Sequence, residues 1–277
     1  MRQLFLILLF SSTTFTLFAQ DTLSSLRKNH IYVGSGYSKH IVKDEIISPL
    51  IYKGYKLPIW IKYKRYGNKY LHNISLFYNR VGLESSITNK DNYYSHNTDN
   101  INAYFAYGIE KKIHSIKNIN LDIYLGAKFK SYINYRDHSY MSNIHSIIAE
   151  QNSSLDLNTK FMKVYNTQGD FISYNFNFPI IAYILMPDMY NANVSKHIYN
   201  VNASEGMALQ YLRNGDFVSL NKFLEFQSEL HAIKSIHKNI AIGLTHYLHY
   251  YSLKKHPDNQ PVKYVNIQFT LDLIIKL

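Results

Sequence analysis

The side chains of this sequence that could do chemistry are carboxylates, lysines and histidines, set at alternate positions of long apolar–polar runs. Glu225 and Glu229 offer a carboxylate pair of the kind used in general acid–base catalysis. Four residues of extended chain separate them by about 13 Å, which is too far to share a proton. His246 and His249 are spaced by three, which places them on opposite faces of a strand and prevents them from binding one metal ion. We therefore expect no metal and no cofactor.

The sequence contains no clear motif for nucleophilic catalysis. Residues Gly34–Ser38 read GSGYS, whereas a nucleophile elbow requires Gly-x-Ser-x-Gly. Ser, His and acidic residues do not occur at a spacing that defines a triad, although such groups also meet across strands. We expect a protein without a catalytic site. A hydrolase embedded in a membrane and acting on lipid or peptide stays open as the alternative, with unknown catalytic residues.

The C-terminal run Val265–Leu277 shows which elements position these groups. Its residues alternate apolar and polar, with Ile274 as the one exception on the polar face. This pattern indicates an antiparallel strand with one apolar and one polar face. The run exceeds the roughly 9–11 residues that cross a bilayer as a tilted strand, whereas strands of soluble proteins are commonly about five or six residues. A terminal strand of this kind is expected to pair with the first strand and close a barrel.

The same alternation predicts ten strands. These are 30–40, 55–65, 71–83, 101–113, 121–135, 154–165, 171–186, 220–232, 239–253 and 265–277. Pro58 and Pro179 interrupt two of them, which indicates a bulge or weakens the assignment of a strand there. The segment 215–232 also has apolar residues near helical spacing, so a partly helical structure is the alternative there.

The links between these strands alternate in length. Short links are expected at 66–69, 114–118, 166–170 and 233–238, and long links at 41–54, 86–100, 136–153, 187–218 and 256–262. Short periplasmic turns and long extracellular loops are typical of outer-membrane barrels. The fold class is therefore all-β, a transmembrane antiparallel barrel of about ten strands, with eight or twelve as alternatives. A soluble β-sandwich is less consistent with strands of this length.

Composition and the N-terminus indicate export. Residues 1–20 have one Arg, an apolar run from Leu4 to Phe10, and small and polar residues before Asp21, as in a secretory signal peptide. Residues 21–277 then form the barrel. The chain has no cysteine and no run of eighteen apolar residues, which excludes a disulfide framework and membrane-spanning helices. The net charge of +11 does not indicate a nucleic-acid partner, because the protein is exported and its basic residues gather at turns.

The distribution of charge suggests partners on both sides of the membrane. Lys and Arg gather near the expected short turns, namely Lys62, Lys64, Arg65, Lys69, Lys111, Lys112, Lys117, Lys160, Lys163, Lys234 and Lys238. They could face the headgroups of outer-membrane lipids, or could be ordinary solvated turn residues. Many acidic residues lie in the long loops. The segment 187–218 is long enough to fold inward or to bind a protein partner.

A set of polar side chains is expected to face the lumen of the barrel. In a small barrel such charges usually pair across the lumen and fill it, and a wide porin is not expected. These residues are Glu110, Lys128, Lys130, Glu225, Glu229, His231 and Asp272.

The chain resembles the small outer-membrane β-barrel proteins of Bacteroidota. The resemblance depends on the Phe18-Ala19-Gln20 ending of the N-terminal segment, the strands rich in Tyr and Asn, and the C-terminal strand. It covers most of the chain but is architectural, and no motif defines a subfamily. It implies a location in the outer membrane of a Gram-negative cell envelope. The expected function is a narrow pore, a surface-binding protein or a barrel that forms part of a complex.

Overall fold

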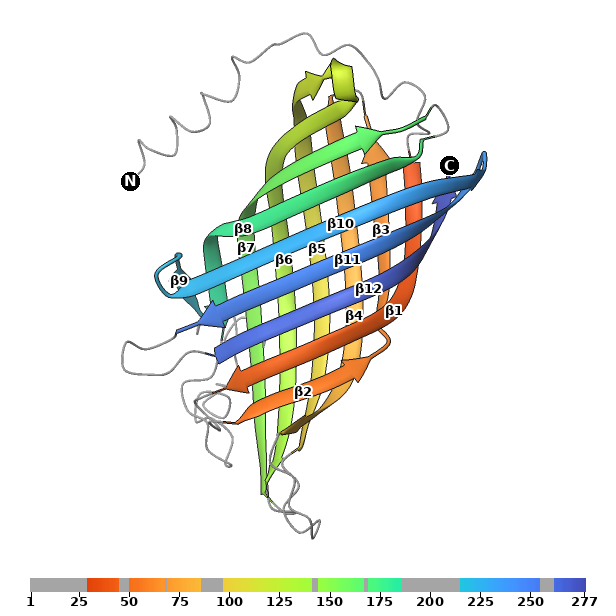
Figure 1. The fold of residues 1–277 in the computed structure, drawn as a ribbon. Helices are drawn as coiled ribbons and strands as arrows, with labels where there is room; N and C mark the ends of the chain where they lie inside the picture. Colours follow the sequence, from red (N-terminus) through yellow and green to blue (C-terminus); the bar gives the residue numbers. More distant parts are fainter. Residues whose placement is uncertain are drawn as a thin grey trace, which may run out of the picture.

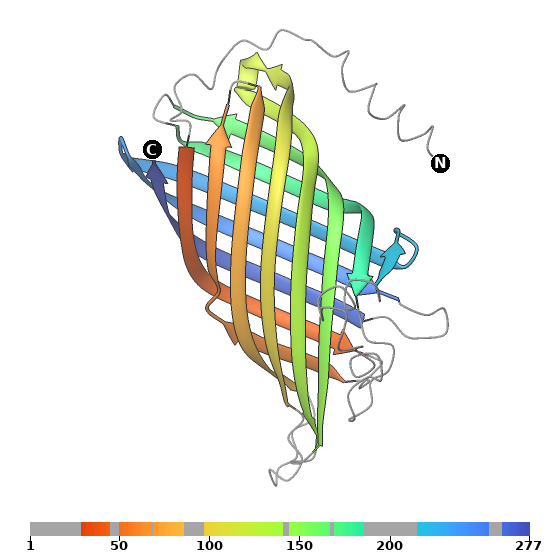
Figure 2. The same ribbon diagram turned by 180° about the vertical axis from the view of Figure 1, so that it is seen from behind.

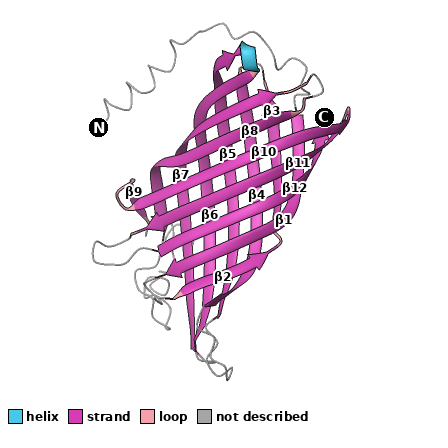
Figure 3. Cartoon of the chain, viewed as in Figure 1, coloured by secondary structure: helices cyan, strands magenta, loops and turns pink. Residues whose placement is uncertain are grey.

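The computed structural model consists almost entirely of antiparallel β-strands (Figure 3). It describes residues 29–44, 50–67, 69–85, 97–140, 144–166, 169–185, 215–254 and 262–277. The strands are β1 (Asn29–Asp44), β2 (Ile51–Lys56), β3 (Ile59–Tyr66), β4 (Tyr70–Ser85), β5 (Asn97–Ile116), β6 (Leu121–Tyr140), β7 (Ile144–Val164), β8 (Phe171–Leu185), β9 (Asp216–Val218), β10 (Phe223–His237), β11 (Ile240–Leu253) and β12 (Val262–Lys276). In these ranges no helix is long and apolar enough to cross a membrane.

The strands form a closed ring with ten positions (Figures 1 and 2). β1 pairs with β12 from His30↔Lys276 to Asp44↔Val262, and β8 pairs with β10 from Gln227↔Asn177 to Ile233↔Phe171. β2 and β3 together occupy one position, and the short strand β9 pairs with β8 alone. The prediction of a ten-stranded antiparallel barrel closed by its first and last strands is confirmed.

Both prolines lie at irregularities of the sheet. Pro58 falls between β2 and β3, and Pro179 lies in β8 beside a register shift of β7 between Leu155 and Asp156. Proline has no N–H to donate to a ladder of hydrogen bonds, so a strand is interrupted or bulged where proline occurs. The expected bulge is present at Pro179. At Pro58 the strand is interrupted without a bulge, because β2 and β3 keep the same register against β1. The segment 215–232 is not helical, since it forms β9, a turn and the beginning of β10.

The two ends of the barrel differ. We call the end with the short connections 67–69, 117–120, 165–170 and 238–239 the turn end, and the opposite end the loop end. The two described chain ends meet at the turn end, where the N–H of Leu277 donates to the carbonyl of Asn29 at 2.8 Å. Of the loop expected at 187–218, residues 187–214 lie outside the described residues, while 216–218 form β9. Residues 45–49, 86–96, 141–143 and 255–261 also lie outside the described residues.

One predicted long loop is wrong. Residues 136–153 belong mostly to β6 and β7, which pair as far as Tyr140↔Ile144. This hairpin reaches furthest at the loop end in Figures 1 and 2. β7 has 21 residues, about 70 Å of extended chain, and so exceeds what a bilayer crossing needs. The polar residues near the hairpin tip weaken the alternation, which is why the sequence pattern stops short of it.

Period-two alternation determines the two faces of the wall. Large apolar side chains cover the outside, among them Ile59, Leu244 and Leu271 with exposed fractions of 59%, 58% and 61%. Polar side chains line the inside, because the opposite set of residues on each strand points there. A barrel with this arrangement is suited to lipid outside and polar contacts within.

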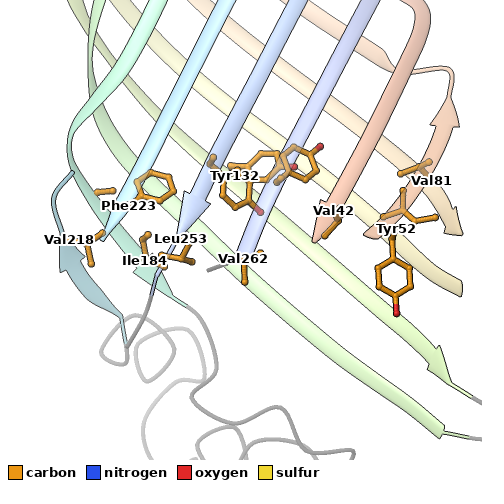
Figure 4. Packing of buried hydrophobic residues seen from close by; sticks show 13 residues of the cluster. Val42, Tyr52, Val81, Tyr132, Ile184, Val218, Phe223, Leu253 and Val262 are labelled. Atoms are coloured by element: carbon orange, nitrogen blue, oxygen red, sulfur yellow. The ribbon is translucent and has the colours of Figure 1, made fainter. Parts of the chain in front are cut away.

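Two clusters of buried apolar side chains lie inside the barrel. The loop-end cluster brings together residues from nearly every strand, including Val42, Tyr52, Val81, Tyr132, Ile184, Val218, Phe223, Leu253 and Val262 (Figure 4). The turn-end cluster contains Tyr32, Tyr66, Leu71, Tyr124, Met162, Phe171, Ile233, Ala241 and Ile274. Along β6, Lys128 and Lys130 lie between Tyr124 of the turn-end cluster and Tyr132 of the loop-end cluster. Along β10, Glu225 and Glu229 lie between Phe223 and Ile233.

Candidate functional site

The seven polar residues expected in the lumen all have inward-facing side chains. Six are buried, with Glu110, Lys130, His231 and Asp272 exposed by no more than 1%. The side chain of Glu229 is 14% exposed. The structure divides six of the seven among several networks rather than one centre, leaves Lys128 outside them, and adds partners from strands that are distant in sequence.

The first network surrounds Lys130 of β6. Its ammonium lies 2.6 Å from the carboxylate of Asp156 and 2.7 Å from that of Glu225. Glu225 also contacts the Nε2 of His249 at 2.6 Å. β6 and β10 are three positions apart in the ring, so the Lys130–Glu225 contact crosses part of the lumen. Each charge is paired, which is the condition under which buried charges are tolerated.

A second network joins opposite walls. The ammonium of Lys62 on β3 lies 2.5 Å from the Glu229 carboxylate on β10, and Lys64 lies 3.6 Å from its other oxygen. Lys62 also sits over the ring of Trp60, 3.3 Å from the centroid. Glu225 and Glu229 therefore serve separate networks, which agrees with the distance expected from their spacing.

The remaining charged residues are held closer to the turn end. Lys160 lies 3.7 Å from Glu110, which also accepts a hydrogen bond of 2.6 Å from the amide of Asn158. Asp272 accepts hydrogen bonds from the hydroxyls of Thr245 and Thr270 at 2.5 and 3.1 Å, and it lies 3.4 Å from the Nε2 of His231.

Sequence reasoning missed two further groups. Ser38 and His40 of β1 contact each other at 2.8 Å, and the Nδ1 of His40 lies 2.8 Å from the hydroxyl of Tyr264. Arg136 pairs with Glu150 at 2.8 Å, and Tyr251 donates to the same carboxylate. Ser38 and His40 share a strand face by period two, and this signal was available. Their contact with Tyr264 requires the pairing of β1 with β12.

The proposed role of four basic residues is wrong. Lys62, Lys64, Lys112 and Lys160 face inward and form ion pairs with carboxylates, so they do not meet lipid headgroups. They alternate with outward-facing residues such as Ile61, Ile113 and Phe161, and their closeness to turns in sequence concealed that they face the lumen. Other basic residues near the turn end are partly or fully exposed, namely Arg65, Lys69, Lys111, Lys117, Lys163, Lys234 and Lys238.

The arrangement is suited to filling a lumen more than to catalysis. The His249–Glu225 and Ser38–His40 pairs could act in proton transfer, but all four side chains are almost fully buried. In the described part of the chain, no three His, Asp or Glu side chains are grouped so as to hold a metal ion. A cavity of about 50 Å³ lies between the apolar layers, beside Trp60, Tyr104, Lys128, Tyr132 and His249.

Comparison with known proteins identifies the class of fold. No protein-family model and no curated protein matches the sequence. Among solved structures, the outer membrane protease OmpT from Escherichia coli is similar with a TM-score of 0.51 and 10% identity, over 94% of this chain and 99% of that one. The translocator domain of autotransporter NalP from Neisseria meningitidis has a TM-score of 0.43 and 8% identity, over 100% of this chain and 95% of that one. The chain has the fold of outer-membrane β-barrel proteins.

Proposed function

We propose that this protein is an integral outer-membrane barrel with a closed lumen, which acts by binding at its loop end rather than by conducting solutes. The observation that carries this proposal is the filling of the lumen. Lys62 and Lys130 reach Glu229 and Glu225 from other walls of the barrel, and an apolar layer lies on each side of these ion pairs. An open channel would leave such groups in contact with water.

The apolar belt and the fold support a location in the outer membrane. The outward residues of β12 run from Val265 to Ile275 without a charge, a length that suits a bilayer crossing. The N-terminal segment, with the features of a signal peptide, supports export. In this orientation the turn end faces the periplasm and the loop end, with the β6–β7 hairpin, faces outward. The segment 187–218, most of which lies outside the described residues, is the proposed binding segment for a partner.

A hydrolase is the less favoured function. Its site would need a histidine and an acidic residue open to substrate near the loop end. His249 and Glu225 do form such a pair, but each is only 2–3% exposed and Glu225 also binds Lys130. The likeness to a protease gives the fold alone at 10% identity.

Single-channel recording in a planar bilayer tests the closed lumen. Folded protein, verified by heat-modifiable migration on a gel, should insert without steady conductance steps. Steady, ion-selective conductance steps would instead indicate that the protein is a narrow pore.

Deletion of 187–214 should leave heat-modifiable migration unchanged, with a deletion of 87–95 in the β4–β5 link as the matched control. Loss of that migration in the 187–214 variant alone would mean that this segment supports the barrel and is not a separate binding surface.

A further inference from the structure

The lumen contains one buried lysine that the ion-pair networks leave out. Lys128 of β6 is 6% exposed and lines the cavity. Within the described ranges, no carboxylate lies within ion-pairing distance of it, and its closest recorded partner is the ring of Tyr104, 5.6 Å from the ammonium. Its direct neighbour across the sheet is Asp156, but that carboxylate is bound by Lys130 and by the hydroxyl of Ser154.

Other donors around the cavity also lack acceptors. The indole Nε1 of Trp60 and the amide Nε2 of Gln268 are buried without a hydrogen-bond partner in the described structure. The carboxylate at this cavity, Glu229, is already shared by Lys62 and Lys64. Buried N–H groups without an acceptor carry a desolvation penalty, and the Lys128 ammonium has no carboxylate beside it, so an acceptor with negative charge would stabilise both.

One wall of the cavity is aromatic. Trp60, Phe77, Tyr104 and Tyr132 are direct cross-strand neighbours on β3, β4, β5 and β6, and all four line the cavity. A volume of about 50 Å³ open to the centres of water-sized molecules exceeds the need of one water, which is about 10–15 Å³ on the same measure. It is about a third of the roughly 150 Å³ that takes benzene, so the space suits a carboxylate of only two or three carbons.

We propose that this lumen cavity binds a small organic carboxylate, anchored by the ammonium of Lys128 and packed against the row Trp60, Phe77 and Tyr104. Lys130 is a lysine on the same strand that cannot bind such a ligand. It lies two residues away on the same face of β6 and is neutralised by Asp156 and Glu225, so it has no capacity left for a ligand. The inference does not depend on what the loop end binds.

The single tryptophan of the chain makes this proposal measurable, because Trp60 lines the cavity. Purified protein in detergent is equilibrated with acetate, and the emission of Trp60 is followed, with acetamide as the neutral probe of similar shape. We expect a saturable change with acetate that is absent with acetamide. Lys128→Gln should weaken the apparent affinity about tenfold or more, as expected for loss of a hydrogen bond to a charged group. Lys238→Gln, in an exposed turn, should leave it unchanged.

Three results would overturn the proposal. These are no saturable change with acetate, an equal response to acetamide, or an unchanged affinity in Lys128→Gln. A stability measurement covers the case in which that variant does not fold. Without ligand, Lys128→Met should keep or raise the thermal midpoint because it removes an unpaired charge, whereas Lys130→Met should lower it. Equal losses in both variants would mean that Lys128 has a structural partner, and the ligand site would be rejected.

Discussion

Lys62 and Glu229 meet at 2.5 Å across the lumen, although 167 residues separate them in the sequence. They belong to β3 and β10, which are four positions apart in the ten-position ring. A contact between such distant strands requires side chains that reach toward the middle of the barrel. The barrel is therefore held together through its interior as well as around its wall.

Breaking this contact should destabilise the barrel. Glu229→Gln leaves Lys62 and Lys64 buried without their carboxylate, and removal of one partner of a buried ion pair costs about 3–5 kcal/mol. The free energy of unfolding, measured by urea titration of the folded band on a gel, should fall by about 3–5 kcal/mol. Glu84→Gln, on the exposed face of β4, is the control and should change little. An unchanged free energy of unfolding in Glu229→Gln would mean that the ion pair makes no net contribution to stability.

Gly34 should be required for the position of Trp60. A Cβ at Gly34 would lie 1.9 Å from the indole Nε1 of Trp60 and 2.2 Å from Asp272, so Gly34→Ala forces the indole to move. We expect a shifted emission of Trp60 and a loss of about 1–3 kcal/mol of stability, as for overpacked cores. Gly82→Ala is the matched control, because a Cβ there meets nothing within 4 Å. Identical spectra for the two variants would contradict this packing.

The outward face of β12 should be in lipid. Leu271 is 61% exposed and lies in the middle of the apolar run, so Leu271→Lys should cost about 2–4 kcal/mol of stability in a bilayer. Ser252→Lys, near the loop end of β11, should cost about 0–1 kcal/mol because it lies near the membrane surface. Folding into lipid vesicles as a function of urea compares the two variants. Equal costs would argue against a bilayer around this part of the barrel.

Asp170 should make the turn end sensitive to acid. Burial raises the pKa of this carboxyl, but the N–H of Ser235 at 2.6 Å and the ammonium of Lys234 at 3.0 Å outweigh burial and lower the pKa to about 2. As the pH falls, the Asp170 carboxylate is protonated near pH 4 in the unfolded chain, before it is protonated in the folded protein. The stability that Asp170 contributes is therefore present above about pH 4 and is lost as the pH falls towards 2.

The variant Asp170→Asn tests this pH dependence. The free energy of unfolding of the native protein should fall more steeply between pH 5 and 2 than that of Asp170→Asn, while the two proteins keep their difference above pH 5. Parallel curves across this range would show that Asp170 does not titrate with folding.

The strands themselves are encoded locally. The alternation in Val265–Leu277 and in the segments around Glu225 and Lys130 predicts strand, inward face and outward face, because a side chain on a strand has only two directions. Pro58 and Pro179 marked the irregularities because the missing N–H is a local property. The sequence pattern missed the β6–β7 hairpin, because strand residues outside the apolar belt need not alternate between apolar and polar types.

The sequence alone predicted the ten-stranded barrel, which the structure confirms, and it predicted an inward direction for a set of polar residues whose side chains are largely buried in the structure, namely Glu110, Lys128, Lys130, Glu225, Glu229, His231 and Asp272. Only the tertiary structure decided their partners. Whether Lys130 meets Glu225 depends on the order of strands around the ring and on how far each strand is shifted against its neighbour. The strand order and these shifts involve residues that are far apart in sequence, and both are determined when the whole barrel closes. For the same reason, the sequence does not distinguish Lys130, whose charge is neutralised, from Lys128, whose charge is not.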